Sequence, residues 1–154
     1  DQVGEGTAIY DHPESAFVAS FVGENNMFHG KVSDATPDFA WVDTDHGRFR
    51  AKNAQTQKGS LSVGDTAYVF IRPESLKFDG NGEFENRVKA DIVQAEFEGN
   101  FWQVYFKMPG SDETIKLSMV NDGRALESEI GSQVELGFDP NLAIALPEGP
   151  LASE

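Results

Sequence analysis

Four side chains that carry oxygen ligands alternate along one short polar stretch, in the order Asp79, Asn81, Glu83 and Glu85. Carboxylate and amide oxygens are the ligands that Ca²⁺ prefers. A calcium loop of the EF-hand type also needs glycine at its sixth position and glutamate at its twelfth. This chain has Phe84 and Ala90 there. The stretch is therefore interpreted as a polar turn around Asn81-Gly82, and no metal site is predicted.

A second polar group consists of Asp43, Asp45 and His46, which could approach one cation together. Aspartate and histidine just before a glycine are also ordinary at the tip of a hairpin, and we favour that interpretation. The other histidines, His12 and His29, have no carboxylate or nucleophile at a spacing typical of a catalytic triad. We therefore expect no catalytic residue and no metal ligand.

The motifs that bind phosphate groups are missing. No Gly-x-x-x-x-Gly-Lys-Ser/Thr run occurs in the 154 residues, which excludes a P-loop in this chain. The absence of cysteine excludes disulfides, thiolate metal sites and a cysteine nucleophile. We expect no cofactor and no catalysis by these residues.

Three aromatic side chains, Trp41, Trp102 and Tyr105, could form a platform for a sugar, as in a carbohydrate-binding β module. That function requires at least two of the rings to be exposed and roughly coplanar. Trp102 alternates in step with Val104 and Phe106, so a place in the core or in an interface is the better interpretation for this residue.

The charge balance disfavours several classes of partner. Lys and Arg total 12 and Asp and Glu total 26, which gives a formal net charge of −14. Nucleic-acid binding and docking on an anionic membrane both need a basic surface that this sequence does not supply. No apolar run approaches the ~18 residues of a membrane span, and there is no signal peptide. Because the chain begins at Asp1, without an initiator methionine, we expect a piece of a longer protein.

One helix is predicted near the N-terminus, over residues 12–22. Asp11 stands three residues before Glu14, which is the spacing of a capping box, and Pro13 suits the first turn. Apolar residues then repeat at i, i+4, and Gly23 is a natural stop.

After Gly23 the apolar period changes from 3.6 to 2, which predicts short strands separated by turns. The alternating runs are 39–43, 48–52, 66–72, 102–108, 115–119 and 134–138. Such spacing is typical of small barrels or a sandwich, so the fold class is mainly β. A weak repeat divides the chain, because Gly64 and Pro73 are spaced like Gly131 and Pro140. It predicts two similar β units.

Several segments of the sequence resemble the ATP-binding subunits of ABC importers. Residues 2–4, 9–13 and 17–26 resemble the end of the ATPase domain, although the family's Thr-Pro is replaced here by Glu5-Gly6. Residues 71–76 contain the Arg-Pro-Glu signature of the C-terminal regulatory domain of the TOBE type. Residues 131–140, followed by Leu146-Pro147, resemble its closing strands. Residues 23–28 look most like the spermidine/putrescine branch.

The resemblance implies two small oligonucleotide-binding-like (OB-like) barrels of the TOBE/MOP type after one short helix. The signature residues, to which a structural role is assigned, are Gly23, Asn25, Arg72, Pro73, Glu74 and Pro140. The expected divisions are an ATPase-domain tail over 1–24, a first barrel over 25–78, a linker over 79–86, a second barrel over 87–147 and a tail over 148–154.

The implied function is regulation and dimerisation of a transport ATPase, with no catalysis by this chain itself. The implied partners are the ATPase domain of the same chain, onto which the helix at 12–22 would pack, a second copy of the subunit, and membrane permease subunits. ATP and Mg would bind the parent subunit, on the cytoplasmic side of the inner membrane. The alternative is a stand-alone barrel for an oxyanion or a polyamine, and the charge of −14 disfavours the oxyanion.

Overall fold

The computed structural model describes residues 25–56, 59–121 and 128–148, and the expected helix over 12–22 lies outside them. Within these ranges the chain is mainly β, as predicted. The elements are β1 (Asn26–Ala35), β2 (Phe39–Thr44), β3 (Gly47–Asn53), β4 (Thr66–Ile71), η1 (Pro73–Ser75), β5 (Lys77–Phe78), β6 (Asn86–Glu98), β7 (Phe101–Lys107), β8 (Thr114–Val120), β9 (Gln133–Phe138), η2 (Pro140–Leu142) and β10 (Ala143–Pro147).

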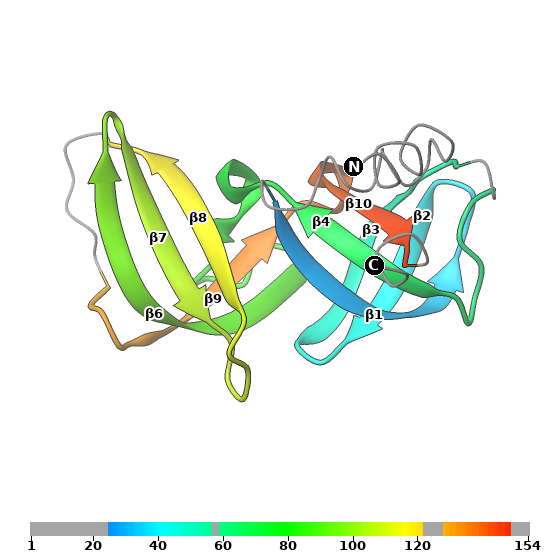
Figure 1. Cartoon of the computed structure of the whole chain (residues 1–154), viewed down its shortest axis with the longest axis horizontal. Coiled ribbons are helices and arrows are strands. Elements are labelled where there is room, and N and C mark those ends of the chain that lie inside the picture. The colour runs from blue at the N-terminus through cyan, green and yellow to red at the C-terminus, as the bar shows by residue number, and fades with distance from the viewer. Residues whose placement is uncertain (1–24, 57–58, 122–127, 149–154) are drawn as a thin grey trace, which may run out of the picture.

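The first unit is a closed barrel in the order β1-β2-β3-β10-β4 (Figure 1). Its hairpin of β2 and β3 turns at Asp45 and His46, as the sequence predicted. Gly47 ends that turn with a φ of 145°, a value that side chains disfavour. β10 closes the barrel by pairing antiparallel with β4 and parallel with β3.

The second unit is a five-stranded sheet in the order β5-β9-β6-β7-β8. Its strands alternate as the sequence predicted, with Val104, Phe106, Ile115 and Leu117 buried on one face. Among the residues that the structure describes this sheet does not close, because β5 pairs there only with β9 and β8 only with β7. One closed barrel and one open sheet therefore stand where two barrels were expected.

The two units exchange their last strands. β5 follows the first unit in sequence but pairs with β9 of the second, whereas β10 follows the second unit and pairs with β3 and β4 of the first. The division expected at 87–147 thus differs from the strand order, in which residues 143–147 belong to the first barrel. The reason is that a 3-10 turn opened by Pro140 leads the chain back across the molecule.

The repeat seen in the sequence corresponds to the same turn in both units. Gly64 donates its N–H to the carbonyl of Val32 at 2.9 Å, and Gly131 donates to Ile92 at 2.7 Å. The two glycines have φ values of 95° and 93°, which glycine adopts most readily. The register of β1 and of β6 shifts just after these contacts, so each turn fills a bulge in a long strand.

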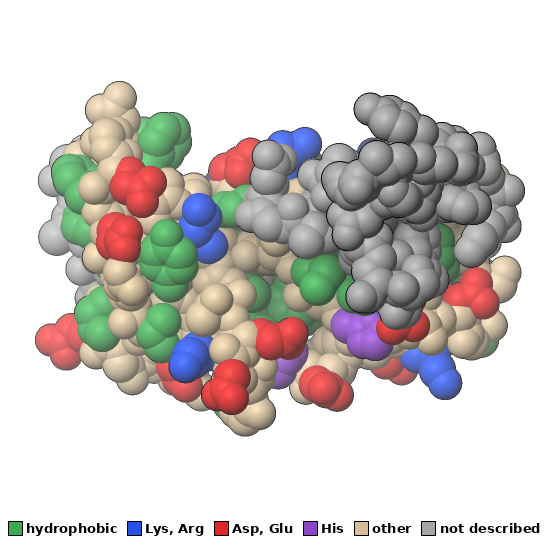
Figure 2. All heavy atoms as spheres, viewed as in Figure 1, with side chains coloured by type: hydrophobic (Ala, Val, Ile, Leu, Met, Phe, Trp, Pro, Cys, Tyr) green, Lys and Arg blue, Asp and Glu red, His purple; other side chains and the backbone are tan. Residues whose placement is uncertain are grey.

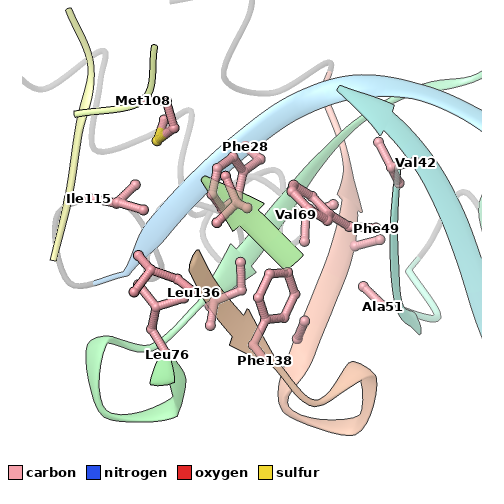
Figure 3. Packing of buried hydrophobic residues seen from close by; sticks show 14 of the residues in the cluster. Phe28, Val42, Phe49, Ala51, Val69, Leu76, Met108, Ile115, Leu136 and Phe138 are labelled. Carbon is pink, nitrogen blue, oxygen red and sulfur yellow. The ribbon is translucent and has the colours of Figure 1, made fainter. Parts of the chain in front are cut away.

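One hydrophobic core runs through both units (Figure 3). The ring of Phe49 lies 4.9 Å from that of Phe28 in the barrel and 5.2 Å from that of Phe138 in the open sheet. All three side chains are buried, and burial of each stabilises the fold by about 1.5–3 kcal/mol. We conclude that the two units share one folding core.

Candidate functional site

Two buried asparagines join the units at their junction. The amide of Asn26, at the start of β1, donates to the carbonyl of Lys116 at 2.8 Å and accepts that residue's N–H at 2.7 Å. The amide of Asn86, at the start of β6, makes the same pair of bonds with the main chain of Arg50, both at 2.8 Å. Each side chain therefore replaces a neighbouring strand for one residue of β8 or β3.

Arg50 is neutralised within the chain. Its guanidinium donates two hydrogen bonds to the carboxylate of Glu85, at 2.7 and 2.6 Å, and lies over the ring of Phe39 at 4.4 Å. The hydrogen bond from Arg50 lowers the pKa of Glu85 below its ordinary value, and the same bond raises the pKa of Arg50. A planar, two-bond pair of this kind fixes side-chain geometry well.

The equivalent position of the second unit is built differently. We call Asn26 and Asn86 the clamping asparagines. Asn25 precedes Asn26, whereas Glu85 precedes Asn86. Asn26 binds Lys116, whereas Asn86 binds Arg50. The ammonium of Lys116 lies 5.9 Å from the centre of the Tyr105 ring. A cavity of about 230 Å³ opens here and is lined by Asn25, Asn26, Pro73, Tyr105, Thr114, Ile115 and Lys116. Burial, followed by the charges of Glu96 and Glu98, raises the pKa of Tyr105.

The Arg-Pro-Glu signature forms a rigid turn at this junction. Pro73 opens η1, while Arg72 and Glu74 are both exposed. Within the described ranges no hydrogen bond or ion pair is made by the charged groups of these two residues. Pro140 is buried and opens η2, where the carboxylate of Asp139 accepts the N–H of Asn141 at 2.8 Å.

The profile of the TOBE domain matches residues 69–146, which is half of the chain. The chain belongs to the TOBE domain family. The match includes Arg72, Pro73, Glu74 and Pro140, and it spans the junction described above.

Two curated relatives extend the likeness of this TOBE domain. The Fe(3+) ions import ATP-binding protein of Rhizobium meliloti is 31% identical over 88% of this chain and 35% of its own length. The spermidine/putrescine import ATP-binding protein of Rubrobacter xylanophilus is 25% identical over 94% of this chain and 37% of its own. The TOBE chain thus spans about a third of the length of these relatives.

A solved structure shares the fold. The cytoplasmic molybdate-binding protein ModG superposes with a TM-score of 0.64 at 15% identity, over 80% of this chain and 96% of ModG. This supports the expected fold class of the OB and MOP type. At that identity the likeness concerns the fold alone.

The polar stretch at 79–86 is a packed turn of the TOBE domain. Asp79 is 3% exposed, and its carboxylate accepts the N–H groups of Glu83 at 2.7 Å and Phe84 at 3.0 Å. Glu85 is held by Arg50 instead. The described residues contain no group of three His, Cys, Asp or Glu side chains that could hold a metal ion.

The histidines and their neighbours take local partners. The carboxylate of Asp43 accepts a hydrogen bond from Ser33 at 3.2 Å, and the N–H of His46 donates to the hydroxyl of Thr44 at 3.1 Å. His29 contacts the carboxylate of Glu148 at 2.6 Å. His12 and Gly23 lie outside the described residues.

The three candidate aromatic residues do not form one platform, which removes the geometric basis of the alternative of a carbohydrate-binding module. Trp41 lies on β2 in the barrel, whereas Trp102 and Tyr105 point to opposite faces of β7. Trp102 packs against the shared core, as its alternation predicted, with its ring 4.6 Å from that of Phe97.

A second cavity, of about 630 Å³, has walls of both charges. Its lining residues are Asp45, His46, Glu85, Arg87, Lys89, Pro109 and Glu135. Arg87 and Glu135 lie 3.8 Å apart, so part of this charge is already paired.

No helix among the described residues is long and apolar enough to cross a membrane.

The clamping asparagines were missed by the sequence analysis. Asn26 and Asn86 stand 60 residues apart, each just before a long alternating run. That spacing is close to the period of the glycine repeat and could have indicated them. The spacing could not indicate that each asparagine binds the opposite unit. That contact depends on how the two units are joined through β5 and β10, which involves residues far apart in the sequence.

Proposed function

We propose that this chain is the C-terminal regulatory and dimerisation domain of the ATP-binding subunit of an ABC importer. The observation that carries the proposal is the TOBE match over residues 69–146, together with relatives that are import ATP-binding proteins and of whose length the match covers about a third. The ATPase activity, with its ATP and Mg, belongs in this proposal to the parent subunit, at the cytoplasmic face of the membrane.

The surface at η1 suits a role in contacts between domains. Arg72 and Glu74 are exposed on a turn that Pro73 stiffens, and the described residues offer their charged groups no partner. A turn whose main chain is already fixed loses little main-chain freedom when it binds another surface, and the cost of binding is then mainly that of ordering the two side chains. The proposed partners are the ATPase domain of the same chain and a second copy of the subunit, with the permease subunits reached through the ATPase domain.

The solute that we propose is a polyamine. Residues 23–28 resemble the spermidine/putrescine branch, and a relative with that name aligns with 94% of the chain. A relative named for iron is also similar, at 31% identity, so any test has to include both solutes.

A chimera tests the proposal directly. The C-terminal part of the spermidine/putrescine import ATP-binding protein of Rubrobacter xylanophilus would be replaced by residues 1–154 of this chain. We expect the chimera to restore ATP-dependent import and dimerisation, compared with the same protein truncated before that part. Iron uptake serves as the control for the solute. A chimera that folds but works no better than the truncated protein would contradict the proposal.

A stand-alone ligand-binding barrel is the other function to be tested. The cavity beside Lys116 has a cation and a tyrosine in its lining, which gives a small ligand a place to bind. Calorimetry of the chain with molybdate and with spermidine separates the two functions. We expect no heat of binding from either, and a saturable signal would favour the ligand-binding barrel.

A further inference from the structure

The outer side of the closed barrel carries an apolar cluster that is separate from the shared core. Side chains alternate between the two sides of a strand, and on β4 and β10 one set belongs to the shared core. That set is Ala67, Val69, Ile71, Ala143 and Ala145. The apolar residues that alternate with this set point out of the barrel and form the second cluster, together with the residue that follows β3. We call this cluster the outer apolar face, and its members are Ala54, Tyr68, Phe70, Ile144 and Leu146.

Two members of the outer apolar face are almost completely buried. Phe70 is 2% exposed and Leu146 is 0% exposed, although both lie on the outside of a closed barrel. The apolar side chains packed against this pair within the described ranges are Ala54, Tyr68 and Ile144, which lie beside it in the same wall. A side chain on the outside of a barrel reaches so low an exposure only when another part of the chain lies over it.

The open sheet shows how apolar side chains of this molecule look without a cover. Phe97 on β6 is 53% exposed, and Val120 on β8 is 65% exposed. Figure 2 shows hydrophobic side chains at the surface over β6–β8. The difference in exposure therefore distinguishes the outer apolar face of the barrel, which is covered, from the apolar surface of the open sheet.

Residues 12–22 have the apolar side chains that such a cover needs. The sequence predicts a helix there, and at about 100° per residue its large apolar side chains share a stripe about 140° wide. The stripe consists of Phe17, Val18, Phe21 and Val22. No charged residue occurs from Ser15 to Gly23, whereas the loop after Ala54 has only small or polar residues at 55–60. The segment 12–22 is therefore better suited than that loop to cover the outer apolar face.

The path of the chain brings residues 12–22 to this face. β1 lies next to β4, where Met27 pairs with Phe70, and Phe70 pairs in turn with Ile144 of β10 (Figure 1). Residues 23–25, which lead from the segment to β1, can span about 10 Å. Two strand spacings, from β1 across β4 to β10, also measure about 10 Å. A helix over 12–22 is about 16 Å long, which is enough to cover both strands from that starting point.

We propose that residues 12–22 form a helix that binds the outer apolar face through its stripe of two phenylalanines and two valines. This docking depends only on contacts within the 154-residue chain. Under the proposed function the same segment ends the ATPase domain, so its docking would also hold the barrel against that domain. The chimera tests that function, whereas measurements on the chain alone test the docking, and either can fail without the other.

A spin label on the segment tests the docking by nuclear magnetic resonance. The sequence has no cysteine, so Ser20→Cys provides one attachment site, on a side of the predicted helix outside the stripe. In an isotope-labelled chain we expect the amide signals of Tyr68, Phe70 and Leu146 to lose more than half of their intensity, compared with the reduced label. The signal of Phe97, at the far end of the open sheet, should keep its intensity.

Three results would overturn the docking of residues 12–22 within the chain. Loss of intensity at Phe70 in an isotope-labelled chain without spin label, mixed with a spin-labelled copy, would mean that a second copy covers the face. Full intensity at Tyr68, Phe70 and Leu146 in the spin-labelled chain would mean that the segment lies elsewhere. An equal loss at Phe70 and Phe97 would mean that the segment prefers neither unit.

A matched pair of variants tests the stripe itself. Phe21→Asp places a charge within the stripe, whereas Ser20→Asp places the same charge one residue away and outside it. The dye ANS becomes fluorescent on exposed apolar surface, so its fluorescence should rise several-fold in Phe21→Asp and stay at the wild-type level in Ser20→Asp. Unchanged tryptophan emission in both variants would show that barrel and sheet remain folded. Equal ANS fluorescence in the two folded variants would contradict the docking, and the spin-label result stands even where Phe21→Asp fails to fold.

Discussion

The closed barrel and the open sheet are built from the same succession of elements, yet only the first is complete. In both, a long bulged strand begins with a clamping asparagine, and a 3-10 turn follows the fourth strand of the unit. They diverge in the strand after that turn, which is five residues long in β10 and two in β5. The comparison shows that closure of such a barrel depends on a strand that follows the other unit in the sequence. The stability of each unit is therefore tied to that of its neighbour.

The largest effect is expected where the two units share one residue. Phe49→Ala removes a ring that is 0% exposed and contacts both Phe28 and Phe138. We expect a loss of about 3–5 kcal/mol in the free energy of unfolding. Barrel and sheet should still unfold together in urea, followed by circular dichroism and by tryptophan fluorescence.

Phe97→Ala is the matched control, since that ring is 53% exposed and lies at the far end of the sheet. It should cost less than about 1 kcal/mol. Two separate unfolding transitions in either variant would show that the units do not share one core.

The next effect compares the two clamps. Asn86→Ala leaves the N–H and the carbonyl of Arg50 without their partner, at a residue that is 1% exposed. We expect a loss of about 1–3 kcal/mol, as for other buried polar groups that lose a partner. Asn26→Ala, at 6% exposure, should cost a similar amount through Lys116.

Asn86→Asp is the complementary variant, because it keeps an acceptor for the N–H of Arg50 but turns a carboxylate oxygen towards the carbonyl of Arg50 at a residue that is 1% exposed. Its loss should be at least as large as that of the alanine variant, since a buried carboxylate that faces another acceptor costs free energy. Urea unfolding measures all three. Stability unchanged in both alanine variants would mean that water replaces the clamps at no cost.

The two clamping asparagines could not be predicted from the sequence, whereas features with a local signal could. Alternation of apolar residues is a local signal, so the strands around Trp102 and Val134 and the hairpin at His46 were predicted well. The glycine repeat at Gly64 and Gly131 was also visible, since a positive φ constrains the residue type.

The pairing of strands that are far apart in the chain leaves no such local signal in the sequence. That Ala145 belongs to the first barrel depends on contacts with residues about 75 to 90 positions earlier, which alternation does not encode. For the same reason the sequence left the alternative of a platform of Trp41, Trp102 and Tyr105 open, since the register and the exchange of strands decide which face and which unit a ring occupies.

A third variant sharpens the account of why the second unit stays open. Asp79→Ala removes the carboxylate that accepts the N–H groups of Glu83 and Phe84. We expect a loss of about 1–2 kcal/mol, because the turn loses two charge-assisted hydrogen bonds at a buried site. Amide exchange at Glu83 and Phe84 should become faster.

The control is Asp43→Ala, which removes an exposed carboxylate at the barrel hairpin and should change stability by less than about 0.5 kcal/mol. Slow exchange at Glu83 and Phe84 in Asp79→Ala would show that the turn holds without this carboxylate. The departure of the chain from the sheet would then need another cause.

The smallest effect concerns the charge pair that one unit has and the other lacks. Glu85→Gln removes the carboxylate bound by Arg50, and because 48% of the Glu85 side chain is exposed, we expect a loss of only about 0.5 kcal/mol at pH 7. Arg50 lowers the pKa of Glu85 in the folded chain. The pair therefore stabilises the fold fully above the ordinary glutamate pKa of 4.5, and this contribution is lost as the pH falls through the lowered folded value.

The difference in melting temperature between wild type and Glu85→Gln should accordingly shrink as the pH is lowered from 7 to 3. Asn25→Glu is the complementary variant, since it places a carboxylate where the second unit has none, near Lys116. It should raise stability at pH 7 by at most about 0.5 kcal/mol and lose that gain over the same acid range. A difference for Glu85→Gln that grows towards pH 3 would have the wrong sign for a lowered pKa, and the two units would then differ for a reason other than charge.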